Sequence, residues 1–128
     1  MDTNEEKNKY KILIVEDEPS LRDALQKSFE RKNFTVLTAE DGEKGMQSAM
    51  DNLPSLILLD IMMPHIDGFS TLQLLKGKQE TKDIPVILLT NLGQDEDRKR
   101  GHELGAVEYL VKADTPLEEI IKISLKYL

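Results

Sequence analysis

The sequence predicts an α/β fold built on one doubly wound parallel sheet, and three observations support this. Short apolar runs alternate with segments whose apolar residues recur at helical spacing. Some runs are apolar at consecutive positions, which is typical of strands buried on both faces of a parallel sheet. Four of the five runs end at an acid, a threonine or a lysine. Because strand–helix–strand units cross over with one hand, helices should cover both sheet faces.

The composition is that of one soluble globular domain. The chain has 128 residues, 39% hydrophobic and 32% charged, which is enough for a single core. No apolar run approaches the roughly 20 residues of a membrane span, and no apolar signal segment opens the chain, so we expect a cytoplasmic protein. The absence of cysteine excludes disulfides and thiolate metal sites. A net charge of −7 argues against binding to nucleic acid or to an anionic membrane.

After a short polar arm at residues 1–10, the domain is expected to span residues 11–128. Five strands are predicted, at residues 11–15, 34–38, 56–59, 84–90 and 107–111. Pro64 and Gly68 break the chain soon after the third strand, and the segment between them reads as a loop that crosses over the site.

Five helices alternate with these strands, at residues 19–30, 43–53, 68–76, 95–104 and 116–128. Pro19 suits the first turn of the first helix, where its missing N–H costs nothing. The run Thr115–Glu118 is a capping-box start for the last helix, with proline at the first helical position. Apolar residues at helical spacing give buried faces, which include Leu53 in the second helix and Leu125 and Leu128 in the last.

Two helices have unusual surfaces. The helix at 95–104 is polar nearly all round, so its support should come from two ion pairs at i, i+4, which are Asp95 with Lys99 and Glu96 with Arg100. Such a helix should be loosely held. On the last helix, Ile123 and Tyr127 extend the apolar face beside its main stripe, and we interpret this extension as part of a partner or dimer surface. Serine at both positions should leave folding intact.

The strand ends carry a chemically coherent set: Glu16 and Asp17, then Asp60, Thr90 and Lys112. These ends converge on one edge of a doubly wound sheet, which is where ligands bind in such folds. Clustered carboxylates repel one another unless a cation intervenes, and a site with only oxygen ligands suits Mg²⁺. A hydroxyl and an ammonium suit phosphoryl oxygens, and a central carboxylate can accept the phosphoryl group itself. The set predicts a Mg²⁺-dependent aspartyl-phosphate site.

Four motifs occupy these strand ends: VEDE, LLDIMMPHIDG, LLT and YLVK. With them the chain resembles the receiver domain of bacterial two-component response regulators over nearly its whole length. The resemblance implies a flavodoxin-like fold with strand order 2-1-3-4-5. It also implies that Asp60 accepts a phosphoryl group from a histidine kinase or phosphotransfer protein. The chain would be a signalling phosphoacceptor, not an enzyme acting on other substrates, and would switch the surface of its fourth helix, fifth strand and fifth helix.

The resemblance also gives a role to each site residue. It implies a Mg²⁺ ion held by Asp17 and Asp60 through their carboxylates, by Met62 through its carbonyl and by Glu16 largely through water. Thr90 and Lys112 would hold the phosphoryl oxygens. Tyr109 would be an aromatic switch that turns inward when Thr90 moves. A homodimer that depends on phosphorylation and an unidentified downstream protein are the partners expected besides the phosphodonor.

Two positions depart from the family pattern. Ala113 follows Lys112, where the family usually has a proline, often through a cis bond, so the peptide geometry that holds the lysine should differ. Asn91 follows Thr90, where a small residue is common. Asparagine here would either narrow access to the phosphoryl group or add a hydrogen bond. Because the attacking water must pass this position, we expect altered dephosphorylation kinetics.

Three other functions use a similar sheet and differ in the residues that they need. A haloacid-dehalogenase-like phosphohydrolase needs a second Asp two places after the nucleophile, where Met62 stands. A flavodoxin-like cofactor binder needs a Ser-, Thr- or Gly-rich loop after its first strand, whereas residues 16–18 are acidic. A receiver-like interaction module that is never phosphorylated stays open. His65 and His102 have no partner imidazole for a metal site and are expected at the surface.

Overall fold

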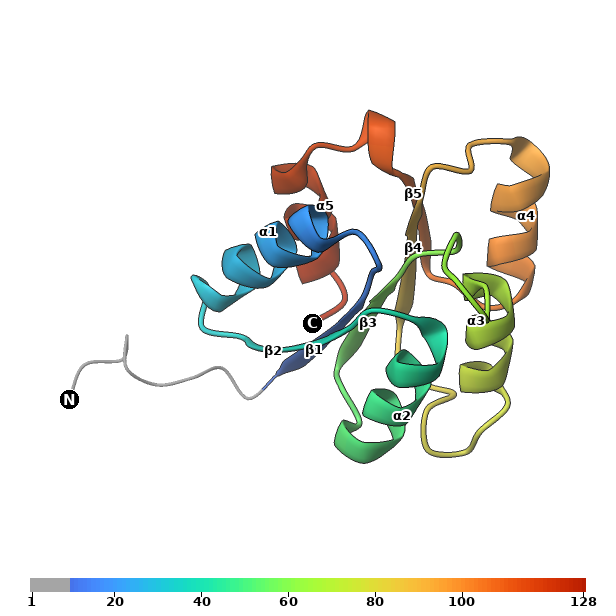
Figure 1. The fold of residues 1–128 in the computed structure, drawn as a ribbon, viewed down its shortest axis with the longest axis horizontal. Coiled ribbons are helices and arrows are strands. Elements are labelled where there is room, and N and C mark those ends of the chain that lie inside the picture. Colours follow the sequence, from blue (N-terminus) through green and yellow to red (C-terminus); the bar gives the residue numbers. More distant parts are fainter. Residues whose placement is uncertain (1–9) are drawn as a thin grey trace.

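The computed structural model describes residues 10–128, so the predicted arm lies outside the described residues except for Tyr10. Five parallel strands form one sheet in the order β2-β1-β3-β4-β5 (Figure 1), which confirms the expected topology. The strands are β1 (Lys11–Val15), β2 (Thr35–Ala39), β3 (Leu56–Leu59), β4 (Val86–Thr90) and β5 (Glu108–Val111). The helices are α1 (Pro19–Glu30), α2 (Gly42–Asn52), α3 (Gly68–Lys76), α4 (Asp95–Glu103) and α5 (Leu117–Leu125).

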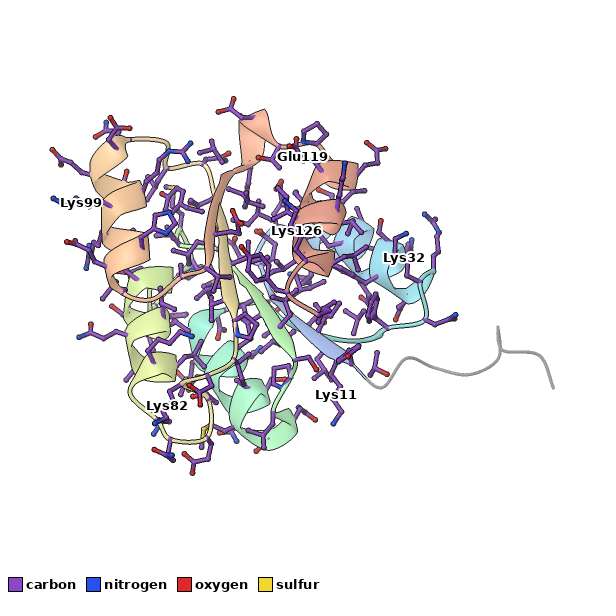
Figure 2. All side chains as sticks on the ribbon, turned by 180° about the vertical axis from the view of Figure 1, so that it is seen from behind. Lys11, Lys32, Lys82, Lys99, Glu119 and Lys126 are labelled. Carbon is purple, nitrogen blue, oxygen red and sulfur yellow. The ribbon has the colours of Figure 1, made fainter. Side chains whose placement is uncertain are left out.

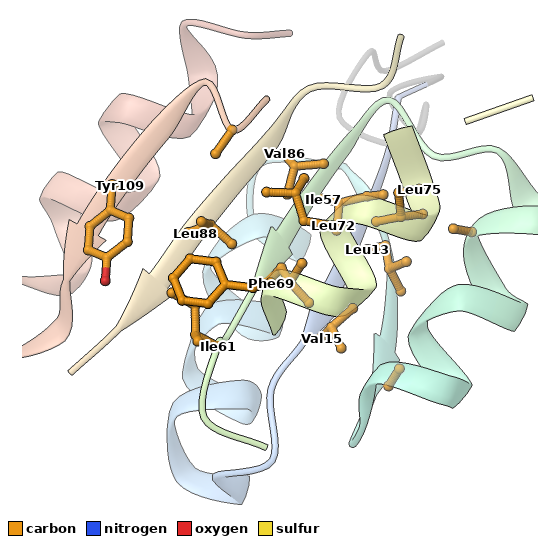
Figure 3. Close-up of a cluster of buried hydrophobic side chains, with 14 of the residues drawn as sticks. Leu13, Val15, Ile57, Ile61, Phe69, Leu72, Leu75, Val86, Leu88 and Tyr109 are labelled. Carbon is orange, nitrogen blue, oxygen red and sulfur yellow. The ribbon is translucent and has the colours of Figure 1, made fainter. Parts of the chain in front are cut away.

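The sheet separates two cores because successive side chains of a strand point to opposite faces. In β1, Leu13 and Val15 belong to one core, and Ile12 and Ile14 belong to the other. α2 and α3 cover the first core, which Figure 3 shows in close-up, and α4 lies on the same side beside β5. α1 and α5 cover the second (Figure 1). Helices therefore cover both faces, as the alternation of elements predicted.

The strand bounds differ slightly from those expected. β2 begins and ends one residue later, and β5 begins at Glu108 instead of Val107. β4 begins at Val86 instead of Ile84. Pro85 has no amide hydrogen to donate to the ladder, so only its carbonyl is used, accepting from the backbone N–H of Ile57 at 3.0 Å.

The start of α5 was predicted wrongly. Thr115 does not cap the helix; its hydroxyl donates instead to the carbonyl of Val111 at 2.8 Å. Pro116 is the N-cap residue, and the helix begins at Leu117. A threonine hydroxyl has several backbone acceptors within reach, and here the carbonyl at i−4 is the one it uses.

Leu53 and Leu125 are also exceptions to the predicted buried faces. Leu53 ends α2 in the left-handed conformation, with φ of 46°, and is 54% exposed. Leu125 is 37% exposed at the end of α5. Leu53 follows the last residue of α2, so helical spacing no longer places it on the buried face, whereas Leu125 is the last residue of α5.

The expected ion pairs on α4 are absent from the described residues. Two arginines of this helix stack on aromatic rings instead. The guanidinium of Arg98 lies 5.5 Å from the ring centre of Tyr109, and that of Arg100 lies 4.4 Å from the ring centre of Phe69. Only Gly101 is buried on this helix. The prediction of a helix with little core of its own is confirmed, but its support comes from cation–π contacts.

Ile123 and Tyr127 are half-buried and pack against the α1–α5 core. The Tyr127 hydroxyl donates to the carboxylate of Glu108 on β5. Serine at both positions would therefore remove core contacts, contrary to the expectation that folding would be unaffected. In the described part of the chain, no helix combines the length and apolar character that a membrane crossing requires.

We predict that the packing of α4 against β4 and β5 requires glycine at position 101. A Cβ there would lie 2.8 Å from Leu88 Cδ1 and 2.9 Å from Tyr109 Cδ2. We expect Gly101→Ala to lower the free energy of unfolding by about 1 kcal/mol or more, because overpacking of about 1–3 kcal/mol exceeds the gain of about 1 kcal/mol in helix propensity. Urea denaturation measures this, with the exposed neighbour His102→Ala as control. A Gly101→Ala protein as stable as the wild type would contradict the prediction.

Candidate functional site

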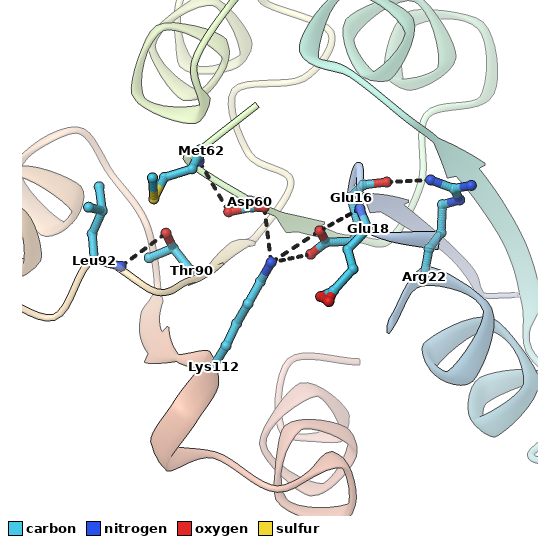
Figure 4. A network of polar contacts seen from close by, with 8 residues as sticks. All are labelled: Glu16, Glu18, Arg22, Asp60, Met62, Thr90, Leu92 and Lys112. Carbon is cyan, nitrogen blue, oxygen red and sulfur yellow. Dashed lines mark hydrogen bonds and ion pairs between the residues drawn. The ribbon is translucent and has the colours of Figure 1, made fainter. Parts of the chain in front are cut away.

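The carboxyl ends of four strands bring the predicted residues to one edge of the sheet. Glu16 follows β1, Asp60 follows β3, Thr90 ends β4 and Lys112 follows β5 (Figure 4). The Lys112 ammonium lies 3.0 Å from Asp60 Oδ2, and 3.0 and 3.1 Å from Glu16 Oε1 and Oε2. Three strands therefore meet at one ammonium group.

Strand register places the two central acids side by side. Val15 pairs with Leu59 in the parallel ladder, so the next residues, Glu16 and Asp60, leave the sheet together. The Asp60 amide still donates to the Val15 carbonyl at 3.0 Å. Behind Asp60 the chain returns so closely that a Cβ on Gly68 would lie 2.3 Å from the Asp60 carbonyl oxygen. Only glycine fits there, which explains the glycine that opens α3.

The edge carries more negative than positive charge. Asp60 and Glu16 are 3% and 2% exposed, and Asp17 beside them is exposed. Three carboxylates against the single ammonium of Lys112 leave a formal charge of −2. Burial, helped by the charge of Asp60, raises the pKa of Glu16 to about 7 against the pull of the Glu18 amide and Lys112. Burial lowers the pKa of Lys112, but its bonds to both acids outweigh this and raise that pKa overall.

The three acids form a group that can hold a metal ion. One carboxylate oxygen from each of Glu16, Asp17 and Asp60 lies within 4.8 Å of the other two. Glu16 Oε1 is buried and has no hydrogen-bond donor among residues 10–128, although the Lys112 charge is near it. An all-oxygen group with excess negative charge suits a hard divalent cation.

Thr90 and Tyr109 are connected through the backbone of one residue. The Leu92 amide donates to Thr90 Oγ1 at 3.3 Å, and the Tyr109 hydroxyl donates to the Leu92 carbonyl at 2.6 Å. Thr90 is fully buried and makes no hydrogen bond to Asp60 in the described chain. The Tyr109 ring is 5% exposed, so it already lies inward, next to Gly101.

Sequence reasoning missed several residues around the site. Arg22 on α1 donates to the carbonyl of Glu16 at 2.8 Å and fixes the β1–α1 turn (Figure 4). Leu92 contacts Thr90 and Tyr109 through its backbone amide and carbonyl, so no residue pattern could have indicated these contacts. Arg100 was assigned to an ion pair and instead covers Phe69 beside the site. It lines a hollow of about 610 Å³ with Asp17 and Met62.

The departures at residues 91 and 113 leave the lysine in reach of the acids. Lys112–Asp114 form a single 3-10 turn, and residues 10–128 contain no cis peptide bond. Asn91 and Ala113 are exposed and line a hollow of about 450 Å³ beside the Lys112 side chain. His65 and His102 are both exposed, as expected.

An acidic group and a lysine at the carboxyl edge of this five-stranded sheet define a receiver-type signalling module. The model of the response regulator receiver domain family matches residues 12–123. The chain therefore belongs to the response regulator receiver domain family. The DNA-binding dual master transcriptional regulator RpaA of Synechocystis is 42% identical over 80% of this chain. The chain spans 42% of that relative, and less than half of other curated relatives that it matches.

Solved structures give the same assignment. The chemotaxis protein CheY4 of Vibrio cholerae superposes with a TM-score of 0.86 at 27% identity, over 93% of this chain and 98% of that one. The Mn²⁺-bound form of the response regulator Rcp1 superposes with a TM-score of 0.78 at 27% identity, over 91% of this chain and 90% of that one.

The raised pKa of Glu16 predicts how stability changes with pH. Its folded pKa of about 7 lies above the ordinary 4.5, so the folded chain binds this proton more tightly, and stability falls as pH rises between these values. From pH 5 to pH 8, the unfolding free energy of the wild type should fall by about 1–3 kcal/mol relative to that of Glu16→Gln. Urea denaturation in the presence of a chelator measures this difference. A difference that is constant across the range would disprove the shift.

Proposed function

We propose that Asp60 accepts a phosphoryl group from a phosphohistidine of a histidine kinase or phosphotransfer protein, with residues 11–128 acting as the receiver unit. The observation that carries the proposal is the ammonium of Lys112, 3.0 Å from Asp60 Oδ2. An ammonium there is placed to contact a phosphoryl oxygen once the carboxylate has attacked phosphorus. Membership of the family supports this chemistry.

In the transfer step, an oxygen of the Asp60 carboxylate forms a bond to phosphorus as the bond from phosphorus to the donor nitrogen breaks. The Met62 amide holds Asp60 Oδ1 at 3.1 Å and orients the carboxylate. Lys112 then moves from Asp60 to a phosphoryl oxygen, and the Thr90 hydroxyl rotates to donate to another. A bound Mg²⁺, held by Asp17, Asp60, the Met62 carbonyl and, through water, Glu16, would neutralise charge on the phosphoryl group.

We propose that the signal leaves the site through Thr90. When its hydroxyl turns to the phosphoryl group, the loop at Leu92 loses one hydrogen bond, and the Tyr109 hydroxyl is held by the same residue. α4 has little core of its own, so a small change at this loop can shift its population of positions. The surface of α4, β5 and α5 would then favour a partner, an output or a second copy of the chain.

Phosphorylation is tested by intact mass after incubation with acetyl phosphate. We expect one phosphoryl adduct, dependent on Mg²⁺, in the wild type and none in Asp60→Asn. Asp67→Asn serves as the matched control, because Asp67 is an exposed acid that caps α3 and should leave the adduct in place.

An adduct that persists in Asp60→Asn would place the phosphoryl group elsewhere. Loss of both adduct and Mg²⁺ binding in the wild type would favour an interaction module that is never phosphorylated. If Mg²⁺ binds but acetyl phosphate gives no adduct, a phosphorylated histidine kinase is the donor to use next, and its failure as well would overturn the proposal.

The lifetime of the adduct should depend on Asn91. This side chain lines the hollow beside Lys112, and we propose that the attacking water passes through that hollow. Asn91→Ala opens that path, and we expect the phosphoryl group to be lost about threefold faster, a change of about 0.7 kcal/mol in activation free energy. Decay of the adduct mass with time measures this. Ser20→Ala, from the same hollow, is the control, and an unchanged lifetime in Asn91→Ala would refute the role.

A further inference from the structure

A groove of about 540 Å³ runs between the end of α1 and the length of α5. Both helices lie on the face of the sheet opposite to α4 (Figure 1). On the α1 side the groove is lined by Ser28, which lies in the helix, and by Arg31 and Lys32, which follow it. On the α5 side it is lined by Leu117, Glu118, Ile121, Lys122 and Leu125. None of the strand-end residues of the proposed phosphoryl site lines it, so its role does not depend on that site.

The floor of the groove is an apolar row. Leu117, Ile121 and Leu125 follow one another at i, i+4 and i+8, which aligns them along one side of α5. The row is about 12 Å long at a rise of 1.5 Å per residue. Ile121 is 5% exposed and Leu117 is half-buried, so Leu125, at 37%, is the residue of the row most open to solvent. The floor therefore matches the length of about two helical turns of another chain.

The rim of the groove is positively charged. Three cations, Arg31, Lys32 and Lys122, and one acid, Glu118, give it a formal charge of +2 on a chain whose net charge is −7. None of these cations has an ion-pair partner within residues 10–128. Figure 2 shows Lys32 on the side of α1 and α5, far from Lys99 of α4. Cations near helix ends interact favourably with the helix dipole, but this does not explain why Leu125 beside them is 37% exposed.

We propose that this groove binds an acidic amphipathic helix of a partner protein. Apolar residues of that helix, spaced by three or four, would cover the row, and carboxylates on its flanks would pair with the rim cations. An anionic lipid surface would be repelled by the net charge of −7 on the chain. Nucleic acid would leave the exposed side chain of Leu125 in contact with water and would likewise be repelled by this charge.

The test uses the full ¹⁵N-labelled chain and a synthetic helical peptide of about 15 residues, with leucines every three to four positions and glutamates on both flanks. Two control peptides carry lysine in place of glutamate, or the same composition in shuffled order. We expect the acidic peptide to shift the amide resonances of Ser28, Lys32 and Leu125 and to bind about tenfold more tightly than either control. Equal binding by the lysine peptide, or shifts elsewhere only, would overturn the proposal.

Substitutions distinguish binding in the groove from nonspecific binding elsewhere on the surface. Leu125→Asp and Lys122→Glu should each weaken binding of the acidic peptide about tenfold. The matched controls are Leu74→Asp, at a leucine that is 47% exposed on α3, and Lys99→Glu, at an exposed lysine of α4. These controls should bind as the wild type does. Urea denaturation checks that all four remain folded, and unchanged binding by both groove variants would refute the proposal.

Two other occupants give distinct results, and either would replace the acidic helix. If a second copy covers the row, sedimentation of the chain alone will show a dimer that Leu125→Asp abolishes. If a membrane does, the chain will bind phosphatidylserine vesicles, and Lys122→Glu will prevent this. We expect neither dimerisation nor vesicle binding at concentrations where the acidic peptide binds.

Discussion

The candidate site at the carboxyl edge of the sheet depends on one constraint, which is the repulsion between the buried carboxylates of Glu16 and Asp60. Parallel pairing of β1 with β3 forces the two groups together in a medium of low dielectric constant. Lys112 bridges them from β5 at 3.0 Å, so this ion pair also ties the far strand of the sheet to its centre. One ammonium cannot balance three acids. The remaining negative charge would attract a divalent cation to this edge, and it holds the Lys112 ammonium in ion pairs with Glu16 and Asp60.

Much of this edge could be predicted from sequence because it follows from the topology of the sheet. The buried strands read as apolar runs, and crossovers of one hand bring their carboxyl ends to the same side. A residue that directly follows such a run has little freedom of position, so Glu16, Asp60 and Lys112 meet as expected. The family resemblance added the strand order, which periodicity alone did not supply.

The contacts that could not be predicted from the sequence are those for which one side chain has two alternative interaction groups nearby. Arg100 could pair with Glu96 one turn earlier or lie over Phe69, and a desolvated ring stabilises a cation more than an exposed carboxylate does. Thr115 had both a helix amide and the Val111 carbonyl within reach. Leu53 shows the same limit at a helix end, where the left-handed turn rotates the side chain into solvent. Such outcomes are decided by tertiary geometry that spacing rules do not contain.

The path from Thr90 to Tyr109 runs through the amide and carbonyl of Leu92, and not through its side chain. Every amino acid except proline has these two groups. A replacement of the Leu92 side chain would leave both backbone groups in place, but it would also remove contacts, because this side chain packs against the core. The stability of a variant truncated at residue 92 would therefore report core packing, and not the backbone connection between Thr90 and Tyr109.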